Sequence, residues 1–401
     1  TLRRVIAAVA PEPAASIVGS DQRTTAPFAA LANGYASHLQ DFDDVFNPPQ
    51  TTTHLGSCVW PVVLALGQTR PLDGPGAIAA FVAGFETGAR VACAAGIRHY
   101  ESSWQVSGTA GRPAAACAAA RALGLSGEQA THALGIAAAQ ASGIREIYGS
   151  DTKALQPGKA AMDGVLAGLL AEQGFSARDT ALEGERGLLS AISPAPEPGL
   201  LTDGLGSHWH LRHNGHKVWP GASLSHPAID AAVAVHADPA FNAARVARIE
   251  ARMLPFAAQV TSTPHPRPGP EAKFSAPHCL AIALLTGTVG LDAFGAEWTG
   301  HAAVTALRDR VLLIPDDSVG KRGAVVSARM TDGATVTRAV QQNLGTPENP
   351  LADADLEEKL HRVAAPLIGD PAVAEIIGYC WDLDRLPAVA EILAPVSKAM
   401  T

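Results

Sequence analysis

"GRPAAACAAARALGLSGEQATHALGIAAAQASG", residues 111–143, is the stretch that decides the fold. Alanine and other small residues fill most of its positions, so helices built from it can be buried on several faces. Gly124 is placed to end one helix, and Ser126 with Gln129 has the spacing of a capping box that starts the next. The stretch therefore predicts two closely packed helices inside a larger bundle.

The sequence around this stretch, from about residue 75 to about residue 175, has the same alanine-rich composition. The segments 76–96, "GAIAAFVAGFETGARVACAAG", and 158–174, "GKAAMDGVLAGLLAEQG", are again rich in alanine and punctuated by glycine. In the second segment the larger apolar residues recur at helical spacing before Gly174. These residues are Val165, Leu166, Leu169 and Leu170. We expect a compact helical domain.

The pattern changes after about residue 217. Segments 244–256, "ARVARIEARMLPF", and 321–340, "KRGAVVSARMTDGATVTRAV", alternate apolar and polar residues with period two, which is typical of strands. Asp332-Gly333 is a hairpin signal inside the second segment. Segment 349–369, "NPLADADLEEKLHRVAAPLIG", returns to helical periodicity and begins with acidic residues, which favour a helix start.

These changes predict a mainly α protein made of a large helical domain and an inserted, smaller α+β lid domain. The helical domain comprises residues 1–216 and 348–401, and the lid comprises residues 217–347. A cleft between two such domains is a common place for a ligand.

Composition narrows the classes of function. The chain has 401 residues, 47% of them hydrophobic and 17% charged, with a formal net charge of -8 and no dense Lys/Arg run. We therefore expect a globular protein that binds no nucleic acid. No apolar run approaches the roughly 20 residues of a membrane span. The five cysteines are scattered without metal-binding spacing, which favours a reducing, cytoplasmic location. Residues 1–16 suggest a helix entered partway and not a secretory signal.

An acidic cluster stands out in this chain of low charge. Residues 39–57, "LQDFDDVFNPPQTTTHLGS", place Asp41, Asp43 and Asp44 within four positions and His54 ten residues later. The cluster has three interpretations: a solvated helix end, a site for a hard cation, or an aspartate motif like those of helical terpene cyclases. The third is weak because only 5% of residues are aromatic. The loop around His54 predicts an exposed turn.

Two basic segments follow. In "DTKALQPGKAA", residues 151–161, Lys153 precedes a predicted Pro-Gly turn and Lys159 falls in the first turn of the next predicted helix. Residues 210–230, "HLRHNGHKVWPGASLSHPAID", concentrate cations at the proposed domain junction: His210, Arg212, His213, His216, Lys217 and His226. Their spacing is poor evidence for zinc. A cationic pocket for a polyanionic small molecule explains lysine and histidine alike.

Six ordered segments resemble those of the MmgE/PrpD family, which includes 2-methylcitrate dehydratase, cis-aconitate decarboxylase and iminodisuccinate epimerase. The segments are "NGYASHLQDFDD…HLGS", "TAGRPAAACAAARALGLSGEQATHALGIAAAQASGI", "TKALQPGKAAMDGVLAGLLAEQGF", "HKVWPGASLSHPAID", "EAKFSAPHCLAIALLTG" and "NPLADADLEEKL". The resemblance covers nearly the whole chain. It implies a helical domain with a lid, a homodimer, a small polycarboxylate substrate and no metal or other cofactor.

The resemblance also implies a set of site residues. They are Asp41, His54 and Lys153 as catalytic residues, and Lys217, Gln105, Gln156 and His216 as substrate-binding residues. Removing a proton beside a carboxylate builds up negative charge, so the reaction needs a placed base and nearby cations. We expect His54 to be the acid/base, Asp41 to orient or polarise it, and the lysines to hold carboxylates.

The chain also departs from the family pattern. Gln105 and Gln156 stand where many members have histidine, and Val45 and Ala222 stand where cis-aconitate decarboxylases have threonine and histidine. Glutamine can hydrogen-bond a substrate but cannot exchange a proton near neutral pH. Two hypotheses remain: an active lyase or isomerase, or a divergent member that binds a ligand or serves a specialised pathway. The chain also begins later than family members usually do, so we expect their first helices to be missing from it.

Overall fold

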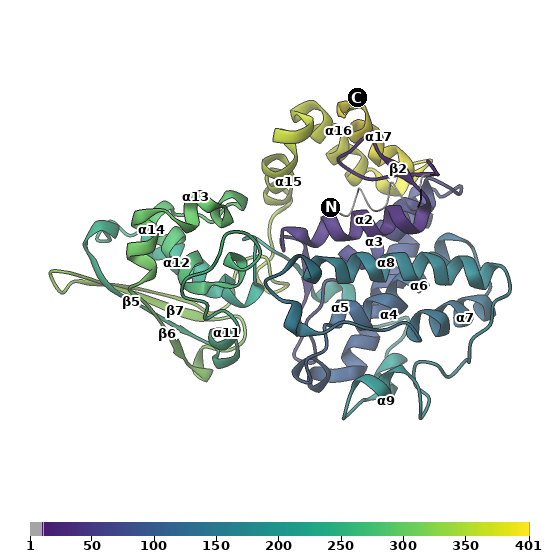
Figure 1. The fold of residues 1–401 in the computed structure, drawn as a ribbon, viewed down its shortest axis with the longest axis horizontal. Coiled ribbons are helices and arrows are strands. Elements are labelled where there is room, and N and C mark those ends of the chain that lie inside the picture. Colours follow the sequence, from purple (N-terminus) through teal and green to yellow (C-terminus); the bar gives the residue numbers. More distant parts are fainter. Residues whose placement is uncertain (1–9, 11, 401) are drawn as a thin grey trace.

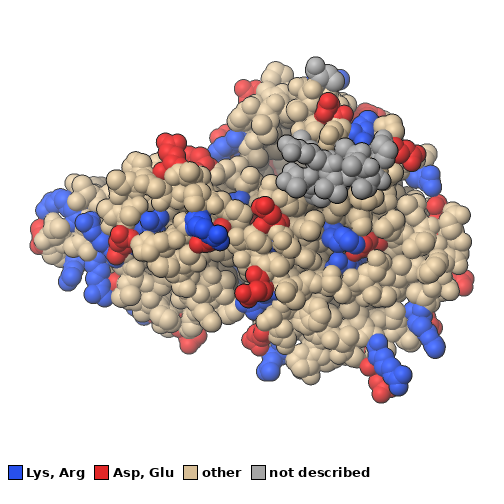
Figure 2. Space-filling model, in the orientation of Figure 1, with Lys and Arg blue, Asp and Glu red and all other residues tan. Residues whose placement is uncertain are grey.

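The computed structural model describes residues 10 and 12–400, so most of the helix expected within residues 1–16 lies outside the described residues. Figure 1 shows two lobes, a larger helical one and a smaller one that contains a sheet. The predicted fold class, mainly α with a smaller α+β part, is confirmed. On the face shown in Figure 2, charges of both signs are scattered over a mostly uncharged surface.

Closely packed helices form the core of the larger lobe. The main contacts join α2 to α8, α4 to α6, and α6 to α8. Glycine makes this proximity possible, since a Cβ atom on Gly164 would lie 2.3 Å from the Ala115 side chain. These helices are α2 (Ala26–Leu39), α3 (Gly56–Gly67), α4 (Gly74–Glu101), α6 (Gly111–Ala122), α7 (Gly127–Ala138) and α8 (Asp151–Glu172). The expected compact bundle is confirmed.

The local helix signals are confirmed with one exception. Ser126 and Gln129 form the predicted capping box of α7, and Gly124 has the left-handed φ of +67° that suits a residue just after a helix. The predicted turn at Pro157 is wrong, because α8 continues through it. Lys159 consequently lies in mid-helix, where it pairs with Asp163 one turn later.

Helix α4 corrects the expectation that no segment is long enough to cross a membrane. Its 28 residues contain an 18-residue window with a mean hydropathy of 1.3, which satisfies the length and composition of a span. The window is 67% buried inside the protein, however, and α4 packs along α6. Burial of this kind is also typical of a core helix, whose apolar surface is covered by neighbouring helices.

The smaller lobe is built on a four-stranded sheet with the order β6-β5-β7-β8. Strand β5 pairs in parallel with β6 and antiparallel with β7, which forms a hairpin with β8. Gly333 in the hairpin turn has φ +89°, as the predicted Asp-Gly signal requires. The strands are β5 (Val246–Met253), β6 (Val311–Pro315), β7 (Ala324–Met330) and β8 (Thr335–Val340). Helices α10 (His226–His236) and α12 (Ala276–Thr286) share its apolar core.

After the sheet the chain returns to the larger lobe. Helices α15 (Asp353–Ile368), α16 (Asp370–Trp381) and α17 (Ala394–Ala399) lie above the bundle in Figure 1. The Val389 backbone N–H donates to the Leu72 carbonyl at 2.9 Å, which ties this end to the loop before α4. The sheet is thus inserted between two helical pieces, while the domain boundaries at residues 216 and 347 stay a prediction.

A short ladder joins two distant parts of the sequence beside the bundle. Strand β3 (Asp44–Phe46) pairs antiparallel with β4 (Asn214–His216), with Asp44 opposite His216. The acidic segment after α2 and the basic segment before the sheet therefore lie side by side. Most of the predicted site residues belong to or flank these two segments.

Candidate active site

A cavity of about 310 Å³ is lined by residues from both lobes. Asp41, His54, Lys153, Lys217 and Gln105 all contribute to its wall. These residues come from the end of α2, the loop before α3, the helix α8, the strand β4 region and the start of α5 (Val106–Thr109). The structure thus brings five of the seven predicted residues to one cavity.

Asp41 is the ionic centre of the site. It is buried, with 4% of its surface exposed, and its φ of +50° is a left-handed conformation that aspartate tolerates better than most residues. Its Oδ1 atom accepts from Lys153 Nζ at 3.1 Å and from Lys217 Nζ. Burial alone would raise the pKa of the Asp41 carboxyl, but the two ammonium groups lower this pKa well below its usual range.

Lys217 is held entirely by protein acceptors. Its Nζ donates to the carbonyl and carboxylate of Asp41 and, at 3.1 Å, to the Gly221 carbonyl. An ammonium has three donors, so none is left for a substrate in this conformation. Lys359, from α15, donates to the Lys217 carbonyl at 2.8 Å and holds this segment from the other side. Lys217 therefore acts through its charge and by fixing Asp41.

Lys153 has a donor to spare. It projects from α8 and lies 3.1 Å from Asp41 Oδ1 and 2.7 Å from His38 Nε2. Its third N–H has no acceptor among the described residues, and the side chain lines the cavity. Burial lowers the pKa of Lys153, although the Asp41 carboxylate opposes this shift.

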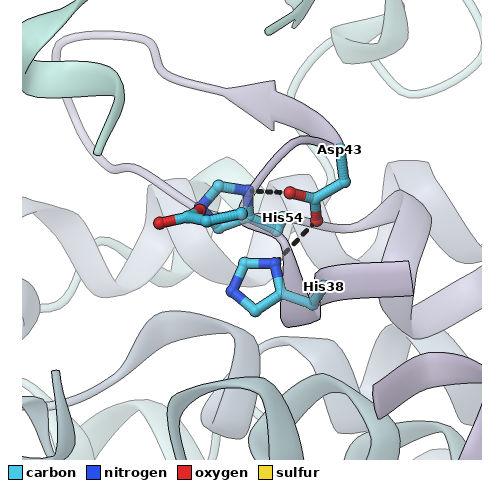
Figure 3. A group of neighbouring side chains, drawn as sticks. His38, Asp43 and His54 are labelled. Atoms are coloured by element: carbon cyan, nitrogen blue, oxygen red, sulfur yellow. Dashed lines mark hydrogen bonds and ion pairs between the residues drawn. The ribbon is translucent and has the colours of Figure 1, made fainter. Parts of the chain in front are cut away.

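His54 presents one free ring nitrogen. Its Nδ1 atom donates to the Asp44 carbonyl at 2.8 Å. The same atom lies 3.4 Å from Asp43 Oδ1 (Figure 3). A carbonyl can only accept, so the proton sits on Nδ1 and the neutral ring keeps a lone pair on Nε2. Nε2 has no hydrogen-bond partner in the part of the chain that the structure describes. The orienting contacts of His54 come from Asp43 and Asp44 and not from Asp41, whose Oδ1 atom accepts from the lysines. The Asp41 carboxylate stays close enough to interact with His54 through its charge.

His38 is a site residue that the sequence analysis missed. Its Nδ1 is 2.8 Å from Asp43 Oδ2, the same carboxylate that faces His54 (Figure 3). Burial lowers the pKa of His38 to about 4, so the neutral ring donates from Nδ1 to Asp43 and accepts from Lys153 at Nε2. Its place three residues before Asp41, at the end of α2, was the available signal.

A group of four residues has donor atoms spaced as in a metal site. One ligand atom from each of His38, Asp41, Asp43 and His54 lies within 4.8 Å of the others. The ammonium groups of Lys153 and Lys217 already occupy cation positions on Asp41, however, and Lys153 also occupies His38 Nε2. A divalent cation there would face two positive neighbours. Among the described residues no other group has this spacing, so the zinc interpretation of residues 210–226 gains no support.

The remaining predicted residues take different positions. Gln105 Oε1 accepts from the Gly108 N–H at 2.6 Å and so caps α5. Gln156 Oε1 is buried beside Gly108 with no partner among the described residues, and Gln156 is not part of the cavity wall. His216 faces a separate small pocket of about 30 Å³. Gln105 therefore lines the cavity with its Oε1 atom engaged in the cap, whereas Gln156 lies outside the cavity wall.

The rest of the cavity wall is largely apolar, and its lysine went unnoticed in the sequence. Lys321, from the loop before β7, donates to the Pro48 carbonyl at 2.7 Å and lines the cavity. Burial lowers the pKa of Lys321 to about 8. The apolar members of the wall are Ile97, Tyr100, Val106, Tyr148, Leu224, Leu254, Phe256, Val260 and Phe274.

Comparison with known proteins agrees with this layout. Residues 1–201 match the MmgE/PrpD N-terminal domain, and residues 219–383 match the MmgE/PrpD C-terminal domain. A cis-aconitate decarboxylase from Aspergillus terreus is 26% identical over 412 residues, which cover 96% of this chain and 84% of that protein. The human cis-aconitate decarboxylase is 28% identical over 382 residues, covering 91% of this chain and 78% of that protein. The cis-aconitate decarboxylase-like protein oryM from Aspergillus oryzae is 26% identical over 96% of this chain.

Proposed function

Because the chain belongs to the MmgE/PrpD family, we propose that it is a lyase or isomerase that removes a proton next to a carboxylate of a small di- or tricarboxylate. The observation that carries the proposal is the free Nε2 of His54, which lies in a cavity beside a buried pair of lysines. The distant relatives named as cis-aconitate decarboxylases support the substrate class.

His54 is the proposed base. Its Nδ1–H is fixed by the Asp44 carbonyl, which leaves Nε2 to take the substrate proton. The resulting imidazolium faces the Asp43 carboxylate at 3.4 Å, so the charge that forms on the ring is stabilised. A placed acid/base group of this kind contributes about 10²- to 10⁴-fold to the rate.

Lys153 is the proposed electrostatic partner. Its free N–H can donate to the substrate carboxylate as the neighbouring carbon loses its proton and negative charge moves onto the carboxylate oxygens. The electron pair left on carbon then expels a leaving group in a lyase, or takes a proton back on the other face in an isomerase. No step needs a metal, because ammonium groups supply the positive charge at Asp41.

The second candidate function is ligand binding without turnover. Gln105 and Gln156 support it, because both replace histidines of many family members and one of them is committed to a helix cap. If lost proton donors are the reason for inactivity, the variant Gln105→His/Gln156→His should gain activity that the natural chain lacks. An unchanged lack of activity in that variant would point to a binding protein.

Exchange of substrate hydrogen with deuterated water tests the proposal directly. The panel comprises citrate, 2-methylcitrate, cis-aconitate and iminodisuccinate analogues, followed by NMR. We expect exchange or turnover for at least one acid, reduced at least 10²-fold in His54→Gln. His265→Gln is the matched control, since its side chain is 67% exposed and lies outside the cavity. Equal rates in the two variants would contradict the role of His54.

A further inference from the structure

The cavity wall combines two kinds of side chain. Asp41, Lys153, Lys217, Lys321 and His54 are its ionic or titratable members used here. Much of the remaining wall is aliphatic or aromatic, and the Tyr148 and Phe274 ring centroids lie 5.8 and 5.6 Å from Lys153 Nζ. The members used below are Tyr100, Tyr148, Leu254, Phe256, Val260 and Phe274. A site that only bound a bare tricarboxylate would have little use for this apolar wall.

The positive charge of the wall is limited. Lys153 and Lys217 share the carboxylate of Asp41, and Lys321 is the remaining lysine of the wall. Glu101 also lines the wall, but its side chain is 53% exposed and pairs with Arg98 at 3.5 Å. The lysines therefore carry two positive charges beyond that of Asp41, and the nearby Asp43 carboxylate offsets one of them. No arginine lines the cavity within the described residues, although arginine is the usual bidentate clamp for carboxylates. This balance suits one or two carboxylates, and a third would be buried without a partner.

The apolar wall is already organised. The Tyr100 and Phe256 rings meet edge to face with their centroids 5.8 Å apart, and the Arg145 guanidinium lies 4.2 Å from the Tyr100 ring centroid behind them. Tyr148 and Phe274 form a second pair at 5.5 Å. Leu254 and Phe256 come from the smaller lobe, at the end of β5 and in α11 (Pro255–Val260). A wall held in this way can receive a ligand without ordering its own side chains first.

We infer that the substrate carries its one or two carboxylates at one end and an apolar or aromatic arm at the other. The carboxylate end lies against Lys153 and Lys321, and the arm lies against Phe256, Leu254 and Val260. This inference rests on the proposed function and narrows its substrate class. It predicts that each added methylene in the arm raises affinity about fourfold until the wall is covered.

Calorimetric titration of the full chain with a graded ligand series tests the arm. The series is succinate, 2-propylsuccinate, 2-pentylsuccinate and 2-benzylsuccinate, with citrate and cis-aconitate as compact tricarboxylates. We expect affinity to rise along the series, with 2-benzylsuccinate binding at least tenfold more tightly than succinate or cis-aconitate. Tighter binding of cis-aconitate than of every arm-bearing ligand, or no dependence on the arm, would overturn the inference.

Variants locate the arm. Phe256→Ala should lower the affinity for 2-benzylsuccinate at least tenfold and leave the affinity for succinate unchanged. The control Phe175→Ala, at a residue that is 57% exposed and outside the cavity, should change neither affinity. Val260→Thr keeps the shape of the side chain and adds a hydroxyl, so it should weaken the same ligand even if Phe256→Ala does not fold. Equal weakening of succinate and 2-benzylsuccinate in Val260→Thr would place the arm elsewhere and contradict the inference.

Deuterium exchange separates this inference from the proposed function. If binding depends on the arm but no ligand hydrogen exchanges, the proton-abstraction function is contradicted and the inference about the arm is supported. If cis-aconitate is turned over but binding does not depend on the arm, the proposed function is supported and the inference about the arm is contradicted.

Discussion

His38 and His54 each face one oxygen of the Asp43 carboxylate, yet they differ in which ring nitrogens remain free. Both nitrogens of His38 are engaged, whereas His54 keeps Nε2. His38 is therefore a positioning residue, since it fixes Lys153 and Asp43 without reaching the cavity. The two histidines of the site thus have separate duties.

Substitution of His38 tests that assignment. His38→Leu removes the acceptor of Lys153 and the donor to Asp43, so Lys153 loses one of the two contacts that orient it. We expect kcat on a verified substrate to fall by up to about 10²-fold, because small misplacement of a catalytic group costs this much. The pH profile of kcat should also shift, since Asp43 then faces His54 alone. An unaltered pH profile with a lower melting temperature would indicate a purely structural role.

Lys217 should matter more for stability than a substrate-binding residue normally does. Lys217→Met leaves the buried Asp41 carboxylate with Lys153 as its remaining ion pair, and breaking a buried pair costs about 3 to 5 kcal/mol. Urea denaturation should show a loss of this size. Asp41→Asn/Lys217→Met should recover part of the loss, and a double variant that is less stable by the full sum would argue against the pair.

Acid should destabilise the protein through two buried histidines. Burial lowers the pKa of His38 to about 4 and the pKa of His226 to about 3, against 6.5 in the unfolded chain. Below pH 6.5 these two histidines are protonated in the unfolded state but stay neutral in the folded state. The free energy of unfolding therefore falls as pH drops from 6.5 towards 4. The slope is about 1.4 kcal/mol per pH unit for each histidine. Urea titrations of His226→Gln should give a shallower slope, and an identical slope would remove His226 from this account.

At the scale of elements, α2 and α8 meet through glycine. A Cβ atom on Gly158 would lie 2.5 Å from the Leu31 carbonyl oxygen and 2.7 Å from the Tyr35 nitrogen, both of them backbone atoms that cannot move aside easily. Helix α8 continues through Pro157 next to this contact. Lys153 takes its position from this packing.

Gly158→Ala should therefore lower the free energy of unfolding by about 1 to 3 kcal/mol, as overpacking does. Gly127→Ala is the matched control, because Gly127 begins α7 with no atom within 4 Å of the added Cβ. That variant should be neutral or slightly more stable. Comparable losses in both variants, measured by urea denaturation, would show that the contact with α2 is not responsible, because alanine favours the helix at both positions.

The sequence predicted the elements whose signals are local. The capping box at Ser126, the hairpin at Gly333 and the helix end at Gly124 each depend on a few neighbouring residues. The turn at Pro157 failed because packing against α2 outweighed the local preference of proline. The pairing of β3 with β4 could not be predicted, since no local pattern relates strands so far apart in the chain.

The same distinction holds for the site. Asp41, His54, Lys153 and Lys217 were selected because the family resemblance marks their positions. The orientation of His54 by Asp43 and Asp44 depends on how the loop after α2 folds back, which spacing does not reveal. His38 was not considered, and its contacts with Asp43 and Lys153 depend on packing between α2 and α8.

For the whole molecule, we expect a homodimer. Exposed apolar residues such as Leu205 and Trp209, which are 66% and 42% exposed, lie on one loop of the larger lobe, and such residues often mark interfaces. Light scattering after size exclusion should give twice the chain mass of 41.2 kDa at micromolar concentration. A mass of one chain would contradict this expectation. Leu205→Ser/Trp209→Ser tests whether this loop belongs to the interface.

The contacts around Asp41 and Phe42 also affect the order in which parts of the chain can fold during synthesis. Lys217 reaches Asp41 across 176 positions of the chain, and Lys359 reaches the Phe42 carbonyl across 317. Contacts of such long range form late, and a chain leaving the ribosome folds its early part first. Until Lys217 has been synthesised, the Asp41 carboxylate in the first two hundred residues lacks this later partner. A nascent chain halted before Lys359 emerges should be more open to proteases around residues 39–57 than the finished protein.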